Sequence, residues 1–304
     1  MSGVVGALAP IFLLILLGHA IRRLKLLEAG FWEPAERLTY FVLFPALLLE
    51  NMATAELRGL QVLPMAAALV GGVLVVAGLL VSLRPRLGLN GPAFTSVFQG
   101  AIRPNTYVGL AAAAALSSEA GITLAAISVA TVTPLVNVLS VAVLARHAGE
   151  AEAGIGQTLA SIARNPLILA VAGGAALNWT GIGLPPVVDP VIDILGRAAL
   201  PLGLLAVGAG LDISAAQTAG RTLLPTAGLK LVLLPGLTWL ACLAFGVEGV
   251  TRTIAVLMSA LPTSASSYIL ARQMGGDHGL LAAIITVTTL LAILTLPAAV
   301  ILAG

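Results

Sequence analysis

The chain has 304 residues, of which 59% are hydrophobic and only 9% are charged, and its mean hydropathy is +1.07. Soluble domains carry about 25% charged residues, so this composition excludes an ordinary soluble enzyme and a disordered protein. The 15 basic and 13 acidic residues give a formal charge of +2 without a basic block, which excludes a nucleic-acid-binding protein. The sequence therefore predicts a protein embedded in a lipid bilayer.

Ten stretches are apolar and long enough to cross a membrane, for which a helix needs about 20 mainly apolar residues. They cover residues 4–22, 36–53, 62–82, 93–116, 121–145, 163–179, 190–211, 220–245, 252–274 and 279–302. The connections between them are short, and we expect the longest, at 147–162, to be a cytoplasmic linker. The sequence thus predicts an all-α polytopic membrane protein with ten transmembrane helices.

The cations in the connections favour one orientation, because cytoplasmic loops of membrane proteins are enriched in Lys and Arg. One set of connections holds only two cations, Arg58 and Arg252. The other set holds ten, namely Arg22, Arg23, Lys25, Arg37, Arg84, Arg86, Arg146, Arg164, Arg221 and Arg272. This bias predicts a multi-pass protein of the inner (plasma) membrane whose N- and C-termini both lie outside, on the periplasmic side.

Prolines recur along the chain at a nearly constant offset. The pairs are Pro10 and Pro166 (offset 156), Pro45 and Pro201 (offset 156), and Pro104 and Pro262 (offset 158). This spacing predicts two five-helix repeats, at 1–146 and 163–304. Because five is an odd number, the second repeat must enter the membrane in the opposite direction. Inverted repeats of this kind recur in secondary transporters, whose binding sites lie where the repeats meet.

The helices at 93–116 and 252–274 are predicted to be broken near their middle, at Pro104 and Pro262. Proline removes a backbone donor and clashes with the preceding turn, and polar residues follow both prolines at once. Unwound backbone at membrane depth is tolerated only inside protein or beside a water-filled cavity. The two breaks therefore form the predicted solute site. Its candidate binding residues are Asn105, Arg103, Pro104, Thr106, Pro262, Thr263 and Ser264.

The charges near these breaks are positive. Arg103 adjoins the first break and offers the planar pair of donors that matches a carboxylate, and Lys230 lies inside the helix at 220–245. No Asp or Glu lies near either break in the sequence, whereas a site for a metal cation or sodium ion needs carboxylates. The pattern predicts an anionic solute, with no metal and no cofactor. Two structural interpretations stay open: Arg103 caps carbonyls of a broken helix, and Lys230 stabilises the crossing of the two broken helices.

Other polar residues have structural interpretations. The serines that follow Pro262 have no nearby His base and no GxSxG elbow, so they do not indicate an enzyme. Asp193 and Arg197 are four residues apart, which predicts an ion pair on one helix face.

Several strings of residues resemble, in order and spacing, those of the auxin efflux carrier family in its bacterial branch, which includes malonate- and malate-type transporters. The strings are PIFLLILLGHAIRR, YFVLFPALLLENMA, RPNTYVGLAAA, TPLVNVLSV, ARNPLILA, LPLGLLAVGAGL and LPTSASSYILARQMGGD. Together they extend over nearly all of the chain. The resemblance implies a fold similar to that of bile-acid symporters and sodium/proton antiporters, in which helices 4 and 9 cross at prolines, here Pro104 and Pro262.

The resemblance also implies that the helices form two groups with different roles. Helices 1, 2, 6 and 7 would form a scaffold, expected to be a homodimer, and helices 3–5 and 8–10 would form a moving transport domain. The crossover asparagine of the family maps onto Asn105. Members carry organic anions, and plant members lack an arginine at the position of Arg103, so a solute with more charge than auxin, such as a dicarboxylate, is expected here.

These features predict a secondary active transporter of small organic anions, mono- or dicarboxylates, which works by alternating access of an elevator type at the helix 4/9 crossover. Its expected partners are the organic anion and the lipid bilayer, with no nucleic acid. The alternatives are a sodium-coupled organic anion symporter, an anion-binding membrane receptor without transport, and a channel.

Overall fold

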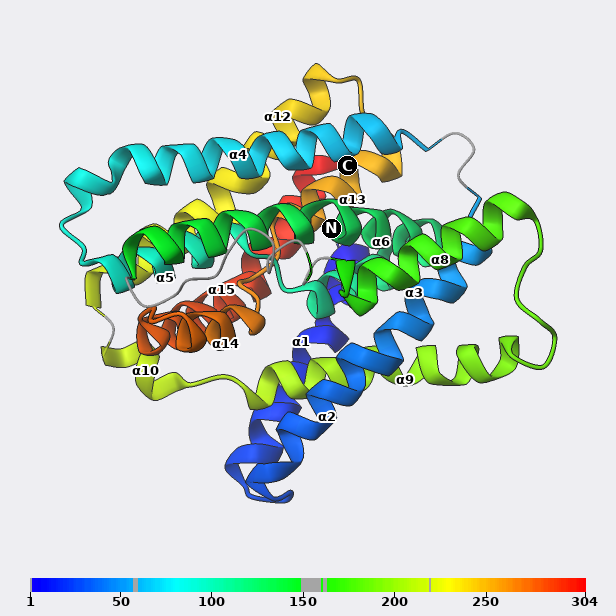
Figure 1. Cartoon of the computed structure of the whole chain (residues 1–304), viewed down its shortest axis with the longest axis horizontal. Helices are drawn as coiled ribbons and strands as arrows, with labels where there is room; N and C mark the ends of the chain where they lie inside the picture. The colour runs from blue at the N-terminus through cyan, green and yellow to red at the C-terminus, as the bar shows by residue number, and fades with distance from the viewer. Residues whose placement is uncertain (1, 57–59, 149–159, 161–162, 219) are drawn as a thin grey trace. The chain divides into compact units, whose positions relative to one another are not determined.

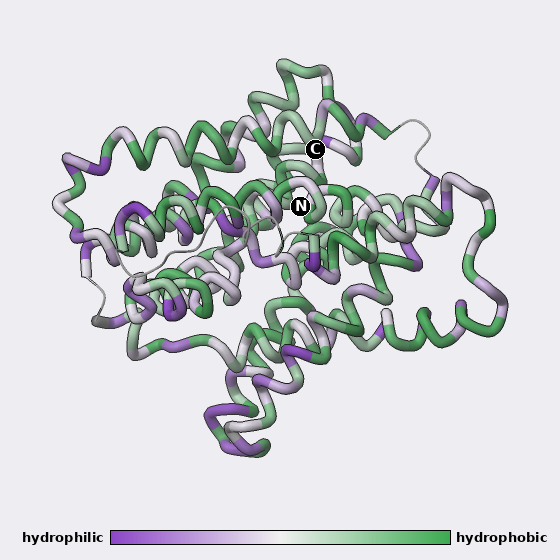
Figure 2. Tube along the Cα trace, viewed as in Figure 1, coloured by the Kyte–Doolittle hydropathy of each residue, from purple (hydrophilic) through white to green (hydrophobic). Residues whose placement is uncertain are grey.

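The computed structural model describes residues 2–56, 60–148, 160, 163–218 and 220–304 (Figure 1). Over these residues the chain is helical and contains no strand. Six helices are long and apolar enough to cross a membrane, and Figure 2 shows that hydrophilic residues gather toward helix ends and in the connections. The predicted class, an all-α polytopic membrane protein, is confirmed for this part of the chain.

The elements follow one another along the chain with short connections. In order they are α1 (Ser2–Arg23), η1 (Ala29–Phe31), α2 (Trp32–Leu38), η2 (Thr39–Leu43), α3 (Phe44–Ala53), α4 (Val62–Leu87), α5 (Gly91–Ile102), α6 (Thr106–His147), α8 (Pro166–Thr180), α9 (Asp189–Ala209), α10 (Ile213–Thr218), η3 (Gly220–Thr222), α11 (Leu223–Gly228), η4 (Leu229–Leu233), α12 (Leu234–Ala244), α13 (Gly249–Ser259), α14 (Ser266–Gln273) and α15 (His278–Ala303).

Four of the ten predicted spans are not among the six long apolar helices. The stretches 93–116 and 252–274 are divided by breaks at prolines. The stretch 36–53 is helical throughout, with the π-helical turn η2 ahead of Pro45, but it carries three charged residues, Glu36, Arg37 and Glu50. Helix α8 has only 15 residues and is one of three shorter apolar helices, with Thr106–Ser117 and Gly249–Ser259. The total of ten membrane spans therefore remains a prediction.

The connection expected between 116 and 121 is present as a reversal of the chain, but its backbone stays helical, because helical backbone runs without interruption from Thr106 to His147. The helix is nevertheless not straight. A Cβ atom on Gly121 would overlap the backbone oxygen of Ala113, whereas residues eight apart in a straight α-helix are about 12 Å apart along the axis. The chain therefore turns back sharply near residues 117–121 without a non-helical loop.

The chain divides into two compact units. The first unit is Met1–Leu60, Tyr107–Ala130 and Ala163–Gly210, and the second unit is Gln61–Thr106, Thr131–Ile162 and Leu211–Gly304. Each unit takes segments from both predicted repeats. The linker predicted at 147–162 lies almost wholly outside the described residues, as does Arg58.

In the first unit, α1 packs against α9 through glycines. A Cβ atom on Gly18 would overlap the backbone oxygen of Leu205, and one on Gly208 would overlap that of Ile15. Only glycine allows two helix backbones to approach this closely. The predicted ion pair on α9 is confirmed, with Arg197 Nε 2.7 Å from Asp193 Oδ1.

In the second unit, side-chain caps determine where α5 and α15 begin. The Asn90 side-chain oxygen accepts a hydrogen bond from Ala93 N at 2.9 Å and starts α5. The Asp277 carboxylate accepts one from Leu280 N at 2.9 Å and starts α15. Both side chains satisfy a backbone N–H that has no partner within its own helix. The starting points of α5 and α15 are thus set by local sequence.

We predict that Gly208→Ala destabilises the protein by about 1–3 kcal/mol, because the added methyl group must push α1 away from α9. Thermal unfolding of the purified protein in detergent measures this as a lower midpoint. Gly6→Ala on α1 is the control, because a Cβ atom there meets nothing within 4 Å and alanine favours helix. An unchanged midpoint for Gly208→Ala would contradict the close approach of the two helices.

Candidate functional site

The first break separates α5, which ends at Ile102, from α6, which begins at Thr106. Arg103 leaves the helical conformation, with φ −84° and ψ 114°. The interruption expected at Pro104 is therefore present. The second break, at residues 260–265, separates α13, which ends at Ser259, from α14, which begins at Ser266, and it contains Pro262 as expected.

The two breaks meet and exchange backbone hydrogen bonds. Asn105 N donates to Pro262 O at 2.9 Å, and Ser264 N donates to Arg103 O at 3.1 Å. Pro104 and Thr263 form an isolated antiparallel bridge at the same place. Backbone groups that a straight helix would pair internally are thus paired between the breaks, as the interior of a membrane protein requires.

Thr263 holds this junction together. Its hydroxyl donates to Gly100 O at 2.7 Å, and its backbone N–H donates to the hydroxyl of Thr288 on α15 at 3.1 Å. The side chain is completely buried. Gly100 allows the close approach, because a Cβ atom there would lie 2.7 Å from Ile284 Cγ2. Thr288 carried no signal in the sequence, since its part depends on how α15 packs.

Arg103 is buried, with 7% of its surface exposed, and its guanidinium is directed to the start of α14. Its Nη2 donates to Ser266 Oγ at 3.2 Å, and Ser266 Oγ lies 2.9 Å from Ser264 Oγ. Ser266 is exposed and Ser264 is half-buried. The sequence singled out Ser264 but not Ser266, which lies four residues after Pro262. A buried cation is therefore linked to hydroxyl groups that reach the protein surface.

The remaining residues of the predicted site are placed by the same junction. Asn105 is buried with 2% of its surface exposed, whereas Pro104 and Thr106 are half-buried. The hydrogen bonds described above bring together Arg103, Pro104, Asn105, Pro262, Thr263 and Ser264, and Thr106 directly follows Asn105 at the start of α6.

Lys230 is placed by the π-helical turn η4. Leu234 N donates to Leu229 O, five residues back, ahead of Pro235, whose ring disfavours regular α-helix there. The Lys230 side chain is completely buried, and its ammonium lies 3.5 Å from Ser259 O. Ser259 is the last residue of α13, where the helix carries a partial negative charge. Lys230 therefore stands at the end of the half-helix that leads into the second break.

No carboxylate of the described chain lies within ion-pair distance of the Lys230 ammonium. Nor do the residues that the structure describes contain three His, Cys, Asp or Glu side chains grouped as metal ligands. A buried cation without a carboxylate costs free energy unless other groups stabilise it, here the carbonyl end of α13.

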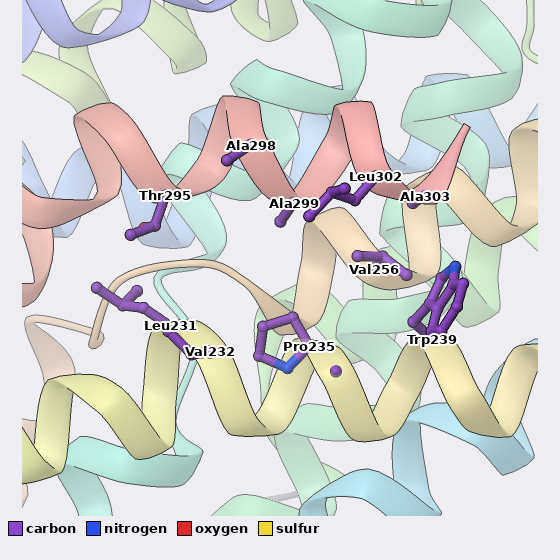
Figure 3. Close-up of a pocket in the computed structure, with 11 residues that line it drawn as sticks. Leu231, Val232, Pro235, Trp239, Val256, Thr295, Ala298, Ala299, Leu302 and Ala303 are labelled. Carbon is purple, nitrogen blue, oxygen red and sulfur yellow. The ribbon is translucent and has the colours of Figure 1, made fainter.

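A cavity of about 460 Å3 lies elsewhere in the second unit, between α12 and α15 (Figure 3). Pro235 and Trp239 line one side and Ala298 and Leu302 the other, with Val256 of α13 between them. None of its lining residues is charged, and none belongs to the predicted site. The apolar walls do not suit an anion, so the junction of the two breaks remains the candidate site.

Comparison with known proteins agrees with this arrangement. A family model described as "Membrane transport protein" matches residues 3–300. One curated relative, named "Putative malonate transporter", is from Rhizobium meliloti (strain 1021). It is 31% identical over 135 residues, which are 44% of this chain and 42% of that relative. Because the family model matches nearly the whole chain, the protein belongs to this family of membrane transport proteins, the auxin efflux carrier family.

Proposed function

We propose that the protein is a secondary active transporter of small organic anions, mono- or dicarboxylates, which bind at the junction of the two breaks. The observation that carries this proposal is the buried Arg103, whose guanidinium lies where two broken helices exchange backbone hydrogen bonds. An arginine matches a carboxylate with two parallel donors, and the surrounding low dielectric strengthens that contact.

Each residue of the junction has a role in this proposal. Arg103 supplies the charge, the Asn105 amide supplies two N–H donors, and the hydroxyls of Thr106 and Ser264 add further hydrogen bonds to the carboxylate. Pro104 and Pro262 keep the backbone open, and Thr263 holds the two breaks together. Helix α6 begins at Thr106 and adds the partial positive charge of its N-terminus.

The division into units supports an elevator type of movement. All of the proposed site residues belong to the second unit, so they can travel together without breaking the hydrogen bonds that form the site. The expected scaffold helices 1, 2, 6 and 7 correspond to α1, the stretch from α2 to α3, α8 and α9, which all belong to the first unit. We propose that these helices form the scaffold, as a homodimer in the inner membrane with both termini outside; the first unit also contains Tyr107–Ala130, which belongs to the expected transport helices 4 and 5.

The name of a relative supports a short dicarboxylic acid as solute. Arg103 supplies one positive charge for one carboxylate, and the relative from Rhizobium meliloti bears the name of a malonate transporter. Lys230, at the carbonyl end of α13, takes the place of a coupling cation in this proposal. Transport is therefore expected to be independent of sodium.

The test is counterflow in proteoliposomes without sodium, preloaded in turn with malonate, malate, succinate, lactate and indole-3-acetate. Saturable exchange of one acid supports the proposal. Exchange that appears only after sodium is added favours the symporter. Binding without exchange favours a receptor, and flux that neither saturates nor exchanges favours a channel.

Asn105→Ala is predicted to lower binding and counterflow of the transported acid about tenfold or more, because a hydrogen bond to a charged group contributes about 1.5–3 kcal/mol. Asn51→Ala is the matched control, since the Asn51 amide donates to Leu47 O within its own helix in the first unit. Asn105→Ala protein that binds and exchanges like the wild type would show that the solute binds elsewhere.

Lys230→Met is predicted to keep anion binding but to lose exchange, because the ammonium stabilises the end of α13 and does not contact the solute. Binding and counterflow are measured on the same preparation, with thermal unfolding to confirm that the variant folds. Lys25→Met, at an exposed position, is the control. Normal turnover of Lys230→Met, or stimulation of the wild type by sodium, would refute the proposed role.

A further inference from the structure

Two polar side chains on α5 and α14, the helices that the Arg103–Ser266 hydrogen bond connects, are completely buried and have unused hydrogen-bonding groups. Gln99 on α5 and Ser267 on α14 both have 0% of their surface exposed. Among the residues that the structure describes, the amide nitrogen and oxygen of Gln99 and the hydroxyl of Ser267 have no hydrogen-bond partner. Most buried polar groups in proteins are paired, so three such atoms on two adjacent helices need an explanation.

Gln99 lies on the face of α5 that is directed toward α14 and the start of α15. Ser96, three residues earlier, donates from its hydroxyl to Asp277 O at 2.8 Å. Arg103, four residues later, donates to Ser266 Oγ on α14 at 3.2 Å. Residues at these spacings share one side of a helix. Gln99 therefore lies between a contact to the α14–α15 connection and a contact to the first residue of α14.

Ser267 lies on the buried face of α14. Ala271, one turn later, is also completely buried. A Cβ atom on Gly276 would lie 3.0 Å from Ala271 Cβ and 3.1 Å from the hydroxyl of Thr95 on α5, so this face packs beside α5. Thr95 and Ser96 satisfy their own hydroxyls by bonds to Pro92 O, at 2.8 and 3.2 Å. The Gln99 amide and the Ser267 hydroxyl make no such bond within the described chain.

We propose that Gln99 and Ser267 form a second half of the solute site, which recognises a neutral carboxyl group while Arg103 takes a carboxylate. An amide presents one donor and one acceptor side by side, and a protonated carboxyl group presents the complementary acceptor and donor. A carboxylate has only acceptors and would leave the amide oxygen of Gln99 unpaired. The Ser267 hydroxyl can donate or accept. This inference rests on the proposed function.

The solute class that fits both halves is the monoanion of a short dicarboxylic acid, with one carboxylate and one carboxylic acid. Such a solute carries one proton in its own O–H bond. Each dicarboxylate that crosses the membrane would therefore be accompanied by one proton, without a titrating side chain in the protein.

Three probes with the same carbon backbone separate the two halves of the site: malonate, its half-amide malonamate and its half-ester monomethyl malonate, which is larger by one methyl group. Both half-derivatives have one negative charge, but only the half-amide retains a donor beside its acceptor. We expect the wild-type full chain to bind the half-amide at least tenfold more tightly than the half-ester in isothermal titration calorimetry. Malonate affinity is expected to rise as the pH falls through the second pKa of malonic acid, while half-amide affinity does not change.

Gln99→Met keeps the length of the side chain and removes its hydrogen-bonding groups, and Ser267→Ala removes the hydroxyl. Both variants are expected to lose the preference for half-amide over half-ester while still binding the half-ester as the wild type does. Ser140→Ala is the matched control, because Ser140 on α6 is another completely buried serine whose hydroxyl lacks a partner within the described chain. It is expected to keep the full preference.

Equal binding of half-amide and half-ester by the wild type would overturn the inference, as would a preference that survives in Gln99→Met. A preference that survives in Gln99→Met would show that the Gln99 amide does not contact the solute. If Gln99→Met does not fold, the three-probe comparison on the wild type and Ser267→Ala decides. Failure of the wild type to bind any of the three anions at any pH would instead refute the proposed function itself.

Discussion

The mutual pairing of two broken helices is the constraint on which the rest of the second unit depends. Inside a bilayer an unpaired backbone group is costly, so neither Pro104 nor Pro262 could interrupt its helix alone. The backbone N–H groups of Asn105 and Ser264 each donate a hydrogen bond to a backbone carbonyl of the opposite break. Thr263 ties the junction to α5 and α15. The two breaks must therefore form together, and the polar side chains beside them are positioned as a consequence.

The two buried cations near the junction stand in opposite electrostatic surroundings. Lys230 lies at the C-terminus of α13, where a helix attracts a positive charge. The Arg103 guanidinium donates to the first residue of α14, where a helix attracts a negative charge. Lys230 is thus stabilised by the protein itself, whereas Arg103 is directed to a place that suits an anion. This difference supports the proposal that Lys230 stabilises the fold and that Arg103 binds the solute.

The sequence predicted those features that depend on neighbouring residues, such as a helix break at a proline or an ion pair between residues four apart. The prolines at 104 and 262 indicated both breaks, and the spacing of Asp193 and Arg197 indicated their ion pair. The hydrogen bonds of Ser266 and Thr288 depend on which helices meet and left no sequence signal. The reversal near Gly121 was predicted by the hydropathy, which separates 93–116 from 121–145, but hydropathy did not indicate that the backbone stays helical while the chain turns. The π-helical turns are likewise invisible to hydropathy, although Pro45 and Pro235 follow them.

The proposed site residues all lie within one compact unit of the chain. The hydrogen bonds that shape the junction run between the two breaks, from Thr263 to Gly100 on α5 and from Thr263 to Thr288 on α15, and all of these residues belong to the second unit. In the proposed elevator movement that unit would move as a body and leave these bonds unchanged, so the same groups would hold the solute while only its access to water changes. A channel needs the opposite arrangement, in which the site is open to both sides at once. The internal bonding of the junction therefore favours a carrier, because it preserves the binding geometry through the movement that alternates access.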